Sequence, residues 1–327
     1  MKSALNLEQL KNRYELANRA DGKSPATVEG YNQILRAFIG YLKDYEDSIS
    51  LSCFTIDMAR AYMLYLRERP KYQGHPFTPA RGNGLSIESI RDHVRTLKAF
   101  STWLHVEEYT EENRLKNLKL PKPDELIIEP LTDDEKTIIL DAINQKTYTG
   151  RRDYAISVLL FDTGLRAGEV AESKKSNLNS GEGFLKVFGK GRKERLVPIG
   201  FQTLSILLEY LTYVRPQVAR PDCDNLFVSE SGGPISVNVI KLLFSRLAKK
   251  SGITRLHAHL CRHTFAIDYL MNGGDIFSLK EILGHSSLEM VNRYLHFTQA
   301  KITARHREFS PMDRFMDNHQ KRRKPKN

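Results

Sequence analysis

The 327-residue chain carries 50 Lys and Arg against 39 Asp and Glu, a formal net charge of +11 at pH 7. An apolar content of 40 % is enough for ordinary cores and excludes wholesale disorder. No apolar run approaches the ~20 residues of a membrane helix, and the charged N-terminal segment lacks the apolar stretch of a signal peptide. We therefore expect a cytoplasmic protein with no membrane contact.

The positive charge is uneven along the chain. Residues 1–120 carry a net charge of +3, residues 121–300 carry +2, and residues 301–327 carry +6. A basic excess suggests a polyanionic partner, but the basic tail also fits a solubilising end. Three cysteines, Cys53, Cys223 and Cys261, are too few and too far apart for a disulfide framework or a CxxC metal site.

The first elements are helical. Ser24 can cap a helix and Pro25 suits its first position, so the sequence predicts a helix over residues 24–44. Two more apolar stripes, in residues 56–66 and 86–104, predict further helices. The Pro- and Gly-rich segment between them reads as a loop, either solvated or touching nucleic acid; its cations are Arg67, Arg69, Lys71 and Arg81.

A domain boundary follows the third helix. Residues 118–131 contain three prolines and no helical period, and Thr132 and Glu135 then have capping-box spacing. The sequence predicts a small helical domain over residues 1–120, a linker over 121–130 and a larger domain over 131–327.

The larger domain is predicted to be mostly helical with one strand pair. Apolar runs on both sides of Gly189 and Gly191 indicate a hairpin over residues 184–199. Its many cations fit either an edge protected by charge or a functional surface. Helical periods recur over residues 202–214, 236–250, 262–272, 276–283 and 286–296. The fold class is therefore mainly α with a small β-sheet.

Four clusters carry candidate chemistry. Arg166 and Glu169 lie where one helix ends at Gly164 and another begins; Lys190 lies in the hairpin turn. His259 and Arg262 are one helical turn apart, so both can face the same way. The run Leu283-Gly284-His285 precedes Tyr294 by nine residues. Each cluster alone is a weak signal, since a lone His or Tyr is usually structural.

In this order, however, the clusters resemble the tyrosine recombinase (phage integrase) family. The resemblance implies a helical SAM-like N-terminal core-binding domain and an α/β-hairpin catalytic domain. It implies the following roles: Arg166 and Arg262 as paired phosphate-binding arginines, Lys190 as the hairpin lysine, His259 and His285 as the two histidines, Tyr294 as the nucleophile, and Glu169 as support for the first arginine. We also expect DNA contacts from Arg81, Arg192, Lys193 and Arg195.

The chemistry of these residue types agrees with the resemblance. Two guanidiniums can clamp the non-bridging oxygens of a phosphodiester in a way that Lys cannot imitate. A tyrosine has an ordinary pKa of about 10, so it needs neighbouring groups to become a nucleophile. Attack by Tyr294 would give a 3′-phosphotyrosyl bond and a free 5′ hydroxyl, and religation then needs neither ATP nor metal. The sequence contains no GxxxxGK[ST] or HExxH motif, and we expect no cofactor.

The predicted function is a site-specific DNA recombinase of the integrase or resolvase type. Two alternatives stay open: a topoisomerase IB-like nicking-closing enzyme, and a non-catalytic DNA-binding protein with the same fold. The expected partners are double-stranded DNA and other copies of the chain in a tetramer on DNA, with an accessory recombinase or directionality protein left open. The segment 300–316, with Phe309, Met312, Phe315 and Met316, can fold back on its own domain or dock on a neighbouring protomer; the resemblance favours docking on a neighbour.

Overall fold

A computed structural model gives the structure of the chain, and it describes residues 6–45, 49–70, 82, 84–123, 128–189, 193–284, 310–312 and 315–316. The chain divides into two compact units, Met1–Leu126 and Ile127–Asn327. Each unit encloses its own apolar core. Among the described residues, no helix combines the length and apolar character of a membrane span.

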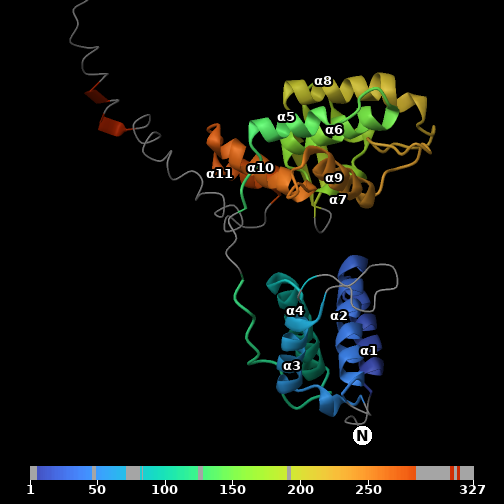
Figure 1. Cartoon of the computed structure of the whole chain (residues 1–327), viewed down its shortest axis with the longest axis vertical. Helices are drawn as coiled ribbons and strands as arrows, with labels where there is room; N and C mark the ends of the chain where they lie inside the picture. The colour runs from blue at the N-terminus through green and yellow to red at the C-terminus, as the bar shows by residue number, and fades with distance from the viewer. Residues whose placement is uncertain are drawn as a thin grey trace, which may run out of the picture. The chain divides into compact units, whose positions relative to one another are not determined.

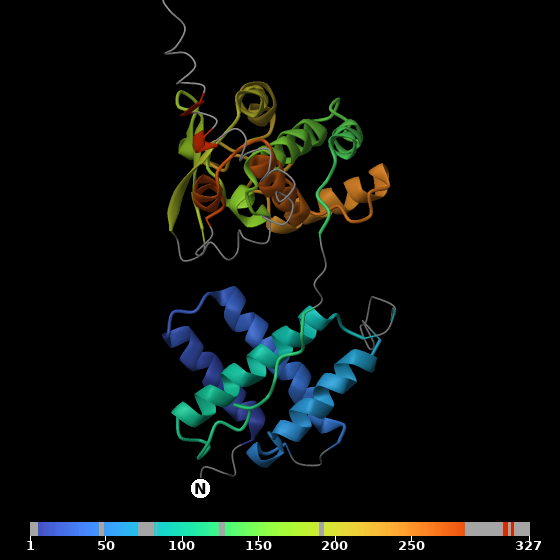
Figure 2. The same cartoon turned by 90° about the vertical axis from the view of Figure 1, so that its left-hand side faces the viewer.

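The described part of the first unit contains four α-helices, seen in the lower half of Figures 1 and 2. They are α1 (Leu7–Ala20), α2 (Pro25–Lys43), α3 (Ile56–Glu68) and α4 (Ile87–Val106), with a short 3-10 turn at Leu51–Cys53. The hydroxyls of Ser24 and Ser86 accept hydrogen bonds from the first turns of α2 and α4. The sequence predicted the cap at Ser24 and a helix starting at Ser86. Helix α1 packs on α2, α3 packs on α4, and α2 packs on α4.

Aromatic side chains form much of the first core. Phe38 meets Tyr62 edge-on with ring centroids 5.0 Å apart, and Phe54 meets Phe100 at 5.4 Å. Edge-to-face pairs of this kind are favoured by the ring quadrupoles. The buried positions on α2 and α4 repeat with the three- and four-residue steps that the sequence showed.

The second unit is mostly helical around a small sheet. Its α-helices are α5 (Asp133–Asp141), α6 (Tyr148–Thr163), α7 (Ala167–Glu172), α8 (Phe201–Glu209), α9 (Val237–Ser251), α10 (Ala258–Met271) and α11 (Ile276–Leu283). Three antiparallel strands in the order β1-β2-β3 span Leu178–Asn179, Phe184–Phe188 and Glu194–Pro198. Helix α6 packs on both α10 and α8, and β3 lies against α11. The mainly α fold with a small sheet is thus confirmed.

Several predicted elements differ in detail. The predicted helix over residues 202–214 is an α-helix only to Glu209 and continues as a π-helical turn over Tyr210–Val214. Helix α10 begins four residues earlier than its predicted stripe, so it also contains His259. The capping box of Thr132 and Glu135 is present at the start of α5. The stripe over residues 286–296 lies outside the described residues.

The hairpin has a clear inner and outer face. Leu185 pairs with Val197, and Val187 pairs with Arg195. Because directly opposed residues of an antiparallel pair point to the same face, these four side chains share one side of the sheet. Leu185, Val187 and Val197 are buried there, which places Arg195 on the core side of the hairpin.

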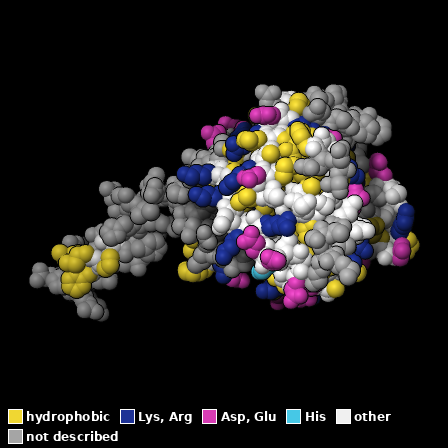
Figure 3. Space-filling model, turned by 90° about the horizontal axis from the view of Figure 1, so that it is seen from below, with side chains coloured by type: hydrophobic (Ala, Val, Ile, Leu, Met, Phe, Trp, Pro, Cys, Tyr) yellow, Lys and Arg dark blue, Asp and Glu magenta, His cyan; other side chains and the backbone are white. Residues whose placement is uncertain are grey.

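Charges of both signs lie side by side on one face of the molecule (Figure 3). On the face shown in Figure 3, Lys and Arg side chains lie next to Asp and Glu side chains.

Cys53 and Cys223 are partly exposed, one in each unit, whereas Cys261 is buried in α10. Burial raises the pKa of the Cys261 thiol well above its ordinary value.

Candidate active site

The turn between α6 and α7 carries the first candidate residue. Gly164 ends α6 in the left-handed conformation at φ 60°, and a Cβ there would lie 2.5 Å from the ring of Phe265. Only glycine fits this close approach without strain. The chain then extends through Arg166, which occupies the N-cap position of α7.

Glu169 holds Arg166 from two directions. The backbone amide of Arg166 donates to Glu169 Oε2 at 2.8 Å, and its Nη1 donates to Oε1 at 3.0 Å. The side chain of Arg166 remains 38 % exposed, while that of Glu169 is buried. The contact that the resemblance implied between these two residues is present, and it leaves the Arg166 side chain partly exposed.

Arg195 occupies the other side of the same carboxylate. Its Nη1 donates to Glu169 Oε1 at 2.8 Å and its Nη2 to Oε2 at 2.9 Å, a bidentate pair. Its Nε donates to the carbonyl of Ile282 at 2.8 Å, and its side chain is only 12 % exposed. The sequence predicted that Arg195 contacts DNA. In the structure, β3 turns this side chain toward the core instead, onto Glu169 and Ile282.

The ionisation of Glu169 reflects these contacts. Burial by itself raises the pKa of a carboxyl group, but the Arg195 hydrogen bonds, the Arg166 amide and both guanidinium charges outweigh it. The pKa of Glu169 is therefore held below its ordinary value, and the group is a carboxylate at neutral pH.

Arg262 links two motif turns. Its Nη1 donates to the carbonyl of Gly164 at 2.8 Å, and its Nη2 donates to the carbonyl of Leu283 at 2.7 Å. Gly164 precedes Arg166 by two residues, and Leu283 is the last residue of α11. The side chain is almost completely buried. Arg262 therefore fixes the ends of α6 and α11 relative to one another.

The end of α11 is held by two arginines. Its last carbonyls, at Ile282 and Leu283, would lack intrahelical partners, and Arg195 and Arg262 each supply one donor. Gly284 then ends the helix at φ 63°, where a Cβ would lie 3.1 Å from the Arg195 guanidinium. The hydrogen bonds from Arg195 and Arg262 thus fix the chain two and three residues before His285.

His259 lies on α10 one turn before Arg262 and reaches solvent. Partial burial, followed by the positive charges of Arg262 and neighbouring groups, lowers the pKa of its imidazole. The neutral ring, which can accept a proton, is therefore favoured at pH 7.

The structure thus brings together Arg166, Glu169, Arg195, Arg262 and the end of α11, with His259 beside Arg262. Lys193 is exposed at the start of the returning strand. Arg81, Lys190, Arg192, His285 and Tyr294 lie outside the described residues. The internal role of Arg195 was missed from the sequence, although the alternation of β3 carries its signal, since Arg195 is two residues before the buried Val197.

Comparison with known proteins agrees with these motifs. Residues 129–301 match the model of the phage integrase family. Tyrosine recombinase XerD of Staphylococcus saprophyticus is 33 % identical over 231 residues, which span 70 % of this chain and 78 % of that protein. This chain belongs to the phage integrase family. Its activity is that of a site-specific tyrosine recombinase.

Solved structures share the fold of this phage integrase family member. The integrase of transposon Tn1549 in complex with a circular intermediate DNA matches with a TM-score of 0.71 at 18 % identity, over 92 % of this chain and 100 % of that one. The XerH recombinase in its post-cleavage complex with a palindromic difH substrate matches with a TM-score of 0.68 at 19 % identity, over 95 % and 86 %. At these identities the likeness concerns the fold.

Proposed function

We propose that this recombinase cuts and rejoins double-stranded DNA through a covalent bond to Tyr294. The observation that carries the proposal is the position of Arg262, whose guanidinium joins the turn before Arg166 to the turn before His285. Motifs that are far apart in sequence therefore meet at one buried cation. Such convergence is expected where several groups must act on one phosphate.

The reaction begins at the scissile phosphate. The Tyr294 oxygen attacks phosphorus, the bond from phosphorus to the 5′ oxygen breaks, and a 3′-phosphotyrosyl bond remains. His259, neutral at pH 7, or His285 accepts the phenolic proton, and Lys190 delivers a proton to the departing 5′ oxygen. Religation reverses these transfers with the 5′ hydroxyl of another strand. One phosphoester replaces another, so the bond energy is kept.

Charge develops on the non-bridging oxygens during each transfer. The partly exposed guanidinium of Arg166 and the nearby Arg262 are the cations proposed to stabilise it. Removing one such preorganised donor costs about 10²–10³ in rate in well-studied enzymes. The carboxylate of Glu169 fixes Arg166 in advance, so the donor need not be ordered when the substrate arrives.

A surface for DNA is proposed on α9. This helix carries no acidic residue, and its cations Lys241, Lys249 and Lys250 are exposed, whereas Arg246 pairs with Asp153 at 3.5 Å. Exposed cations of one sign suit the phosphate backbone, which supplies most of the affinity of DNA-binding proteins. The first unit is proposed as the core-binding domain and the second as the catalytic domain. The DNA substrate also supports the cytoplasm as the place of action.

Assembly into a tetramer on DNA is proposed through the C-terminal segment. Met312, Phe315 and Met316 are exposed to 60 %, 58 % and 50 %. A surface cavity of about 550 Å³ between α6, β3, α10 and α11 is lined by apolar side chains that include Phe161, Phe265 and Ile282, with Asp162 and Asp268 among them. We propose that the segment of one protomer docks in this cavity of its neighbour, because both carry apolar side chains that are open to water.

A trapped covalent adduct tests the reaction. Selection of bound duplexes from a randomised pool supplies the recognition site, and a nick beside the cleavage point lets the short fragment that carries the new 5′ hydroxyl diffuse away. The wild type should then accumulate a protein–DNA adduct, and Tyr294→Phe should form none. Tyr213→Phe is the matched control, because Tyr213 is 65 % exposed on the π-helical turn. An adduct with Tyr294→Phe would overturn the nucleophile assignment; no wild-type adduct on a bound site would favour a non-catalytic protein.

A further inference from the structure

Arg195 makes contacts that neither a surface cation nor an ordinary core residue needs. Its three guanidinium nitrogens each donate a hydrogen bond: two to the carboxylate of Glu169 and one to the carbonyl of Ile282. The two acceptors lie 26 and 87 residues away in sequence. One side chain therefore joins the hairpin to α7 and to α11.

The two contacts lead directly to proposed catalytic groups. Glu169, held by Arg195, in turn holds Arg166 through its backbone amide and its Nη1. Ile282 lies three residues before His285, and Gly284 lies so close to the Arg195 side chain that a Cβ there would be 3.1 Å from the guanidinium. Arg195 itself lies only five residues after Lys190 in the sequence of the same hairpin.

We propose that Arg195 is a positioning residue for phosphoryl transfer, which sets Arg166 through Glu169 and orients the chain that leads to His285. This inference rests on the proposed function, because it assigns Arg195 to the same site. It predicts that Arg195 is needed after DNA has bound, in the step that forms the phosphotyrosyl bond. Because all three guanidinium nitrogens donate within the protein, the proposed effect requires no direct contact of Arg195 with DNA.

Lysine is the informative replacement. Arg195→Lys keeps the positive charge and much of the apolar stem, but a single ammonium cannot hold both carboxylate oxygens and the Ile282 carbonyl in the geometry of a planar fork. Arg166 would then lose part of its fixed orientation. Small displacements of a catalytic group cost up to about 10²-fold in rate, so we expect adduct formation at saturating DNA to slow by about 10-fold to 100-fold.

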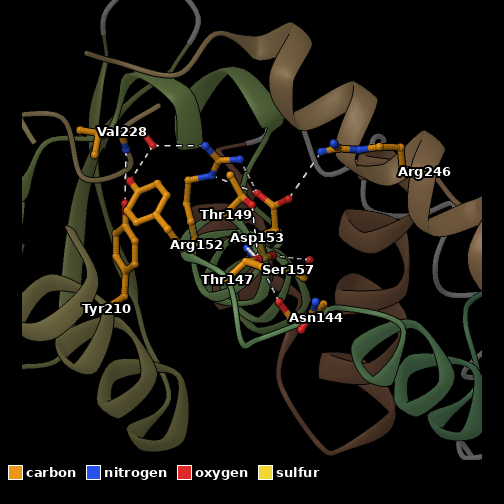
Figure 4. Close-up of polar contacts among 11 residues, drawn as sticks. Asn144, Thr147, Thr149, Arg152, Asp153, Ser157, Tyr210, Val228 and Arg246 are labelled. Atoms are coloured by element: carbon orange, nitrogen blue, oxygen red, sulfur yellow. Dashed lines mark hydrogen bonds and ion pairs between the residues drawn. The ribbon is translucent and has the colours of Figure 1, made fainter. Parts of the chain in front are cut away.

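A second buried arginine provides a matched control (Figure 4). Arg152 donates from Nε and Nη2 to Asp153 at 3.0 and 2.7 Å, and from Nη1 to the carbonyl of Val228 at 3.3 Å. It therefore combines a carboxylate and a backbone carbonyl as Arg195 does, and it is 4 % exposed. It lies near the start of α6, about 18 Å along the helix axis from Gly164 at the other end.

Arg152→Lys should thus disturb folding in a similar way without reaching the site. Both variants are compared at a temperature at which circular dichroism shows them folded. For each, the dissociation constant for the selected duplex and the rate of adduct formation at saturating duplex are measured separately. We expect Arg195→Lys to lose rate with little change in the dissociation constant, and Arg152→Lys to retain both.

A modified substrate separates positioning from general destabilisation. Replacing one non-bridging oxygen of the scissile phosphate by a methyl group removes the charge that Arg166 is proposed to stabilise. If Arg195 acts through Arg166, the rate loss in Arg195→Lys should shrink on this substrate. A loosened fold would give the same loss on both substrates. Glu169→Gln, which removes the carboxylate charge, should reproduce the substrate-dependent loss and replaces Arg195→Lys if that variant does not fold.

The outcomes separate the two levels of inference. If the wild type forms the adduct and Arg195→Lys forms it at the same rate, only the positioning role is overturned. The same holds if the loss matches that of Arg152→Lys or is equal on both substrates. A wild type that forms no adduct on its bound site overturns the proposed function and, with it, the role of Arg195.

Discussion

Arg262 and Leu283, 21 residues apart, are joined by a hydrogen bond of 2.7 Å from Nη2 to the carbonyl oxygen. The bond places a buried cation at the C-terminal end of α11, where the helix carries partial negative charge. The same guanidinium reaches the end of α6. A residue proposed to stabilise phosphate thus also fixes the backbone around the site.

This double role predicts the effect of Arg262→Lys. The ammonium can reach one carbonyl but cannot span both, so one buried acceptor loses its partner. Adduct formation should fall by about 10²–10³ if Arg262 also contacts the phosphate, and the melting temperature should fall as well. Suicide-substrate kinetics and thermal denaturation measure the two effects. A variant that melts lower and yet cleaves at the wild-type rate would show that Arg262 is structural only.

The lowered pKa of His259 predicts a pH dependence. Its imidazole loses its proton more readily than the ordinary value of 6.5 implies, so the ring stays neutral as the pH falls through 6.5. If His259 accepts the Tyr294 proton, adduct formation should hold down to that pH and decline only below it. The unfolded chain takes up this proton first, so His259 also makes the fold less stable as the pH falls below 6.5.

Imidazole NMR of the wild type gives the titration midpoint directly, with His259→Gln used to assign the signal. The acid limb of the rate profile should be altered in the same variant. A midpoint at or above 6.5, or an unchanged acid limb in His259→Gln, would contradict the proton-accepting role.

The exposed cations of α9 predict a salt dependence. Lys241→Gln and Lys249→Gln should weaken DNA binding similarly on different sequences and reduce the slope of log K against log salt by about 0.9 for each lost phosphate contact. Binding isotherms at several salt concentrations measure the slope. Lys136→Gln is the control, because Lys136 is paired with Asp133 and Asp268 on α5 and α10. Equal slopes for the wild type and the α9 variants would remove α9 from the DNA surface.

Deletion of residues 305–327 tests the assembly. The shortened protein should bind a single site and form adduct, but synapsis and strand exchange should fall because the apolar segment that docks on a neighbour is gone. Replacing Met312, Phe315 and Met316 together by Ser should have the same effect while the basic end is retained. Sedimentation on DNA and a two-site recombination assay give the readouts. Full recombination by the deletion variant would refute docking on a neighbour.

Local signals in the sequence account for most of the described helices. Ser24 and Pro25 predicted the start of α2, and the capping box predicted the start of α5. Helix α1 was not predicted, although Leu7, Leu10 and Tyr14 are buried at helical spacing. The two-residue strand β1 could not be predicted, because its pairing with β2 rather than its composition defines it.

The candidate site was less accessible to sequence reasoning. Motif order identified Arg166, Glu169 and Arg262, but a hairpin rich in cations suggested that Arg195 faces DNA. The partner that decides its role, Glu169, is brought near only by the tertiary fold. Counting charges along the hairpin ignored the alternation of β3, which separates Arg195 on the core side from Leu196 at 55 % exposure.

The three cysteines place one partly exposed thiol in each of the two compact units. Cys53 lies in the first unit and Cys223 in the second, both partly exposed, while the Cys261 thiol is buried and its pKa is raised by that burial. Thiol-reactive dyes should therefore label one position on each unit and spare α10. Energy transfer between a donor and an acceptor on Cys53 and Cys223 would follow any change in the distance between the two units when a duplex is added, without introducing a single new cysteine.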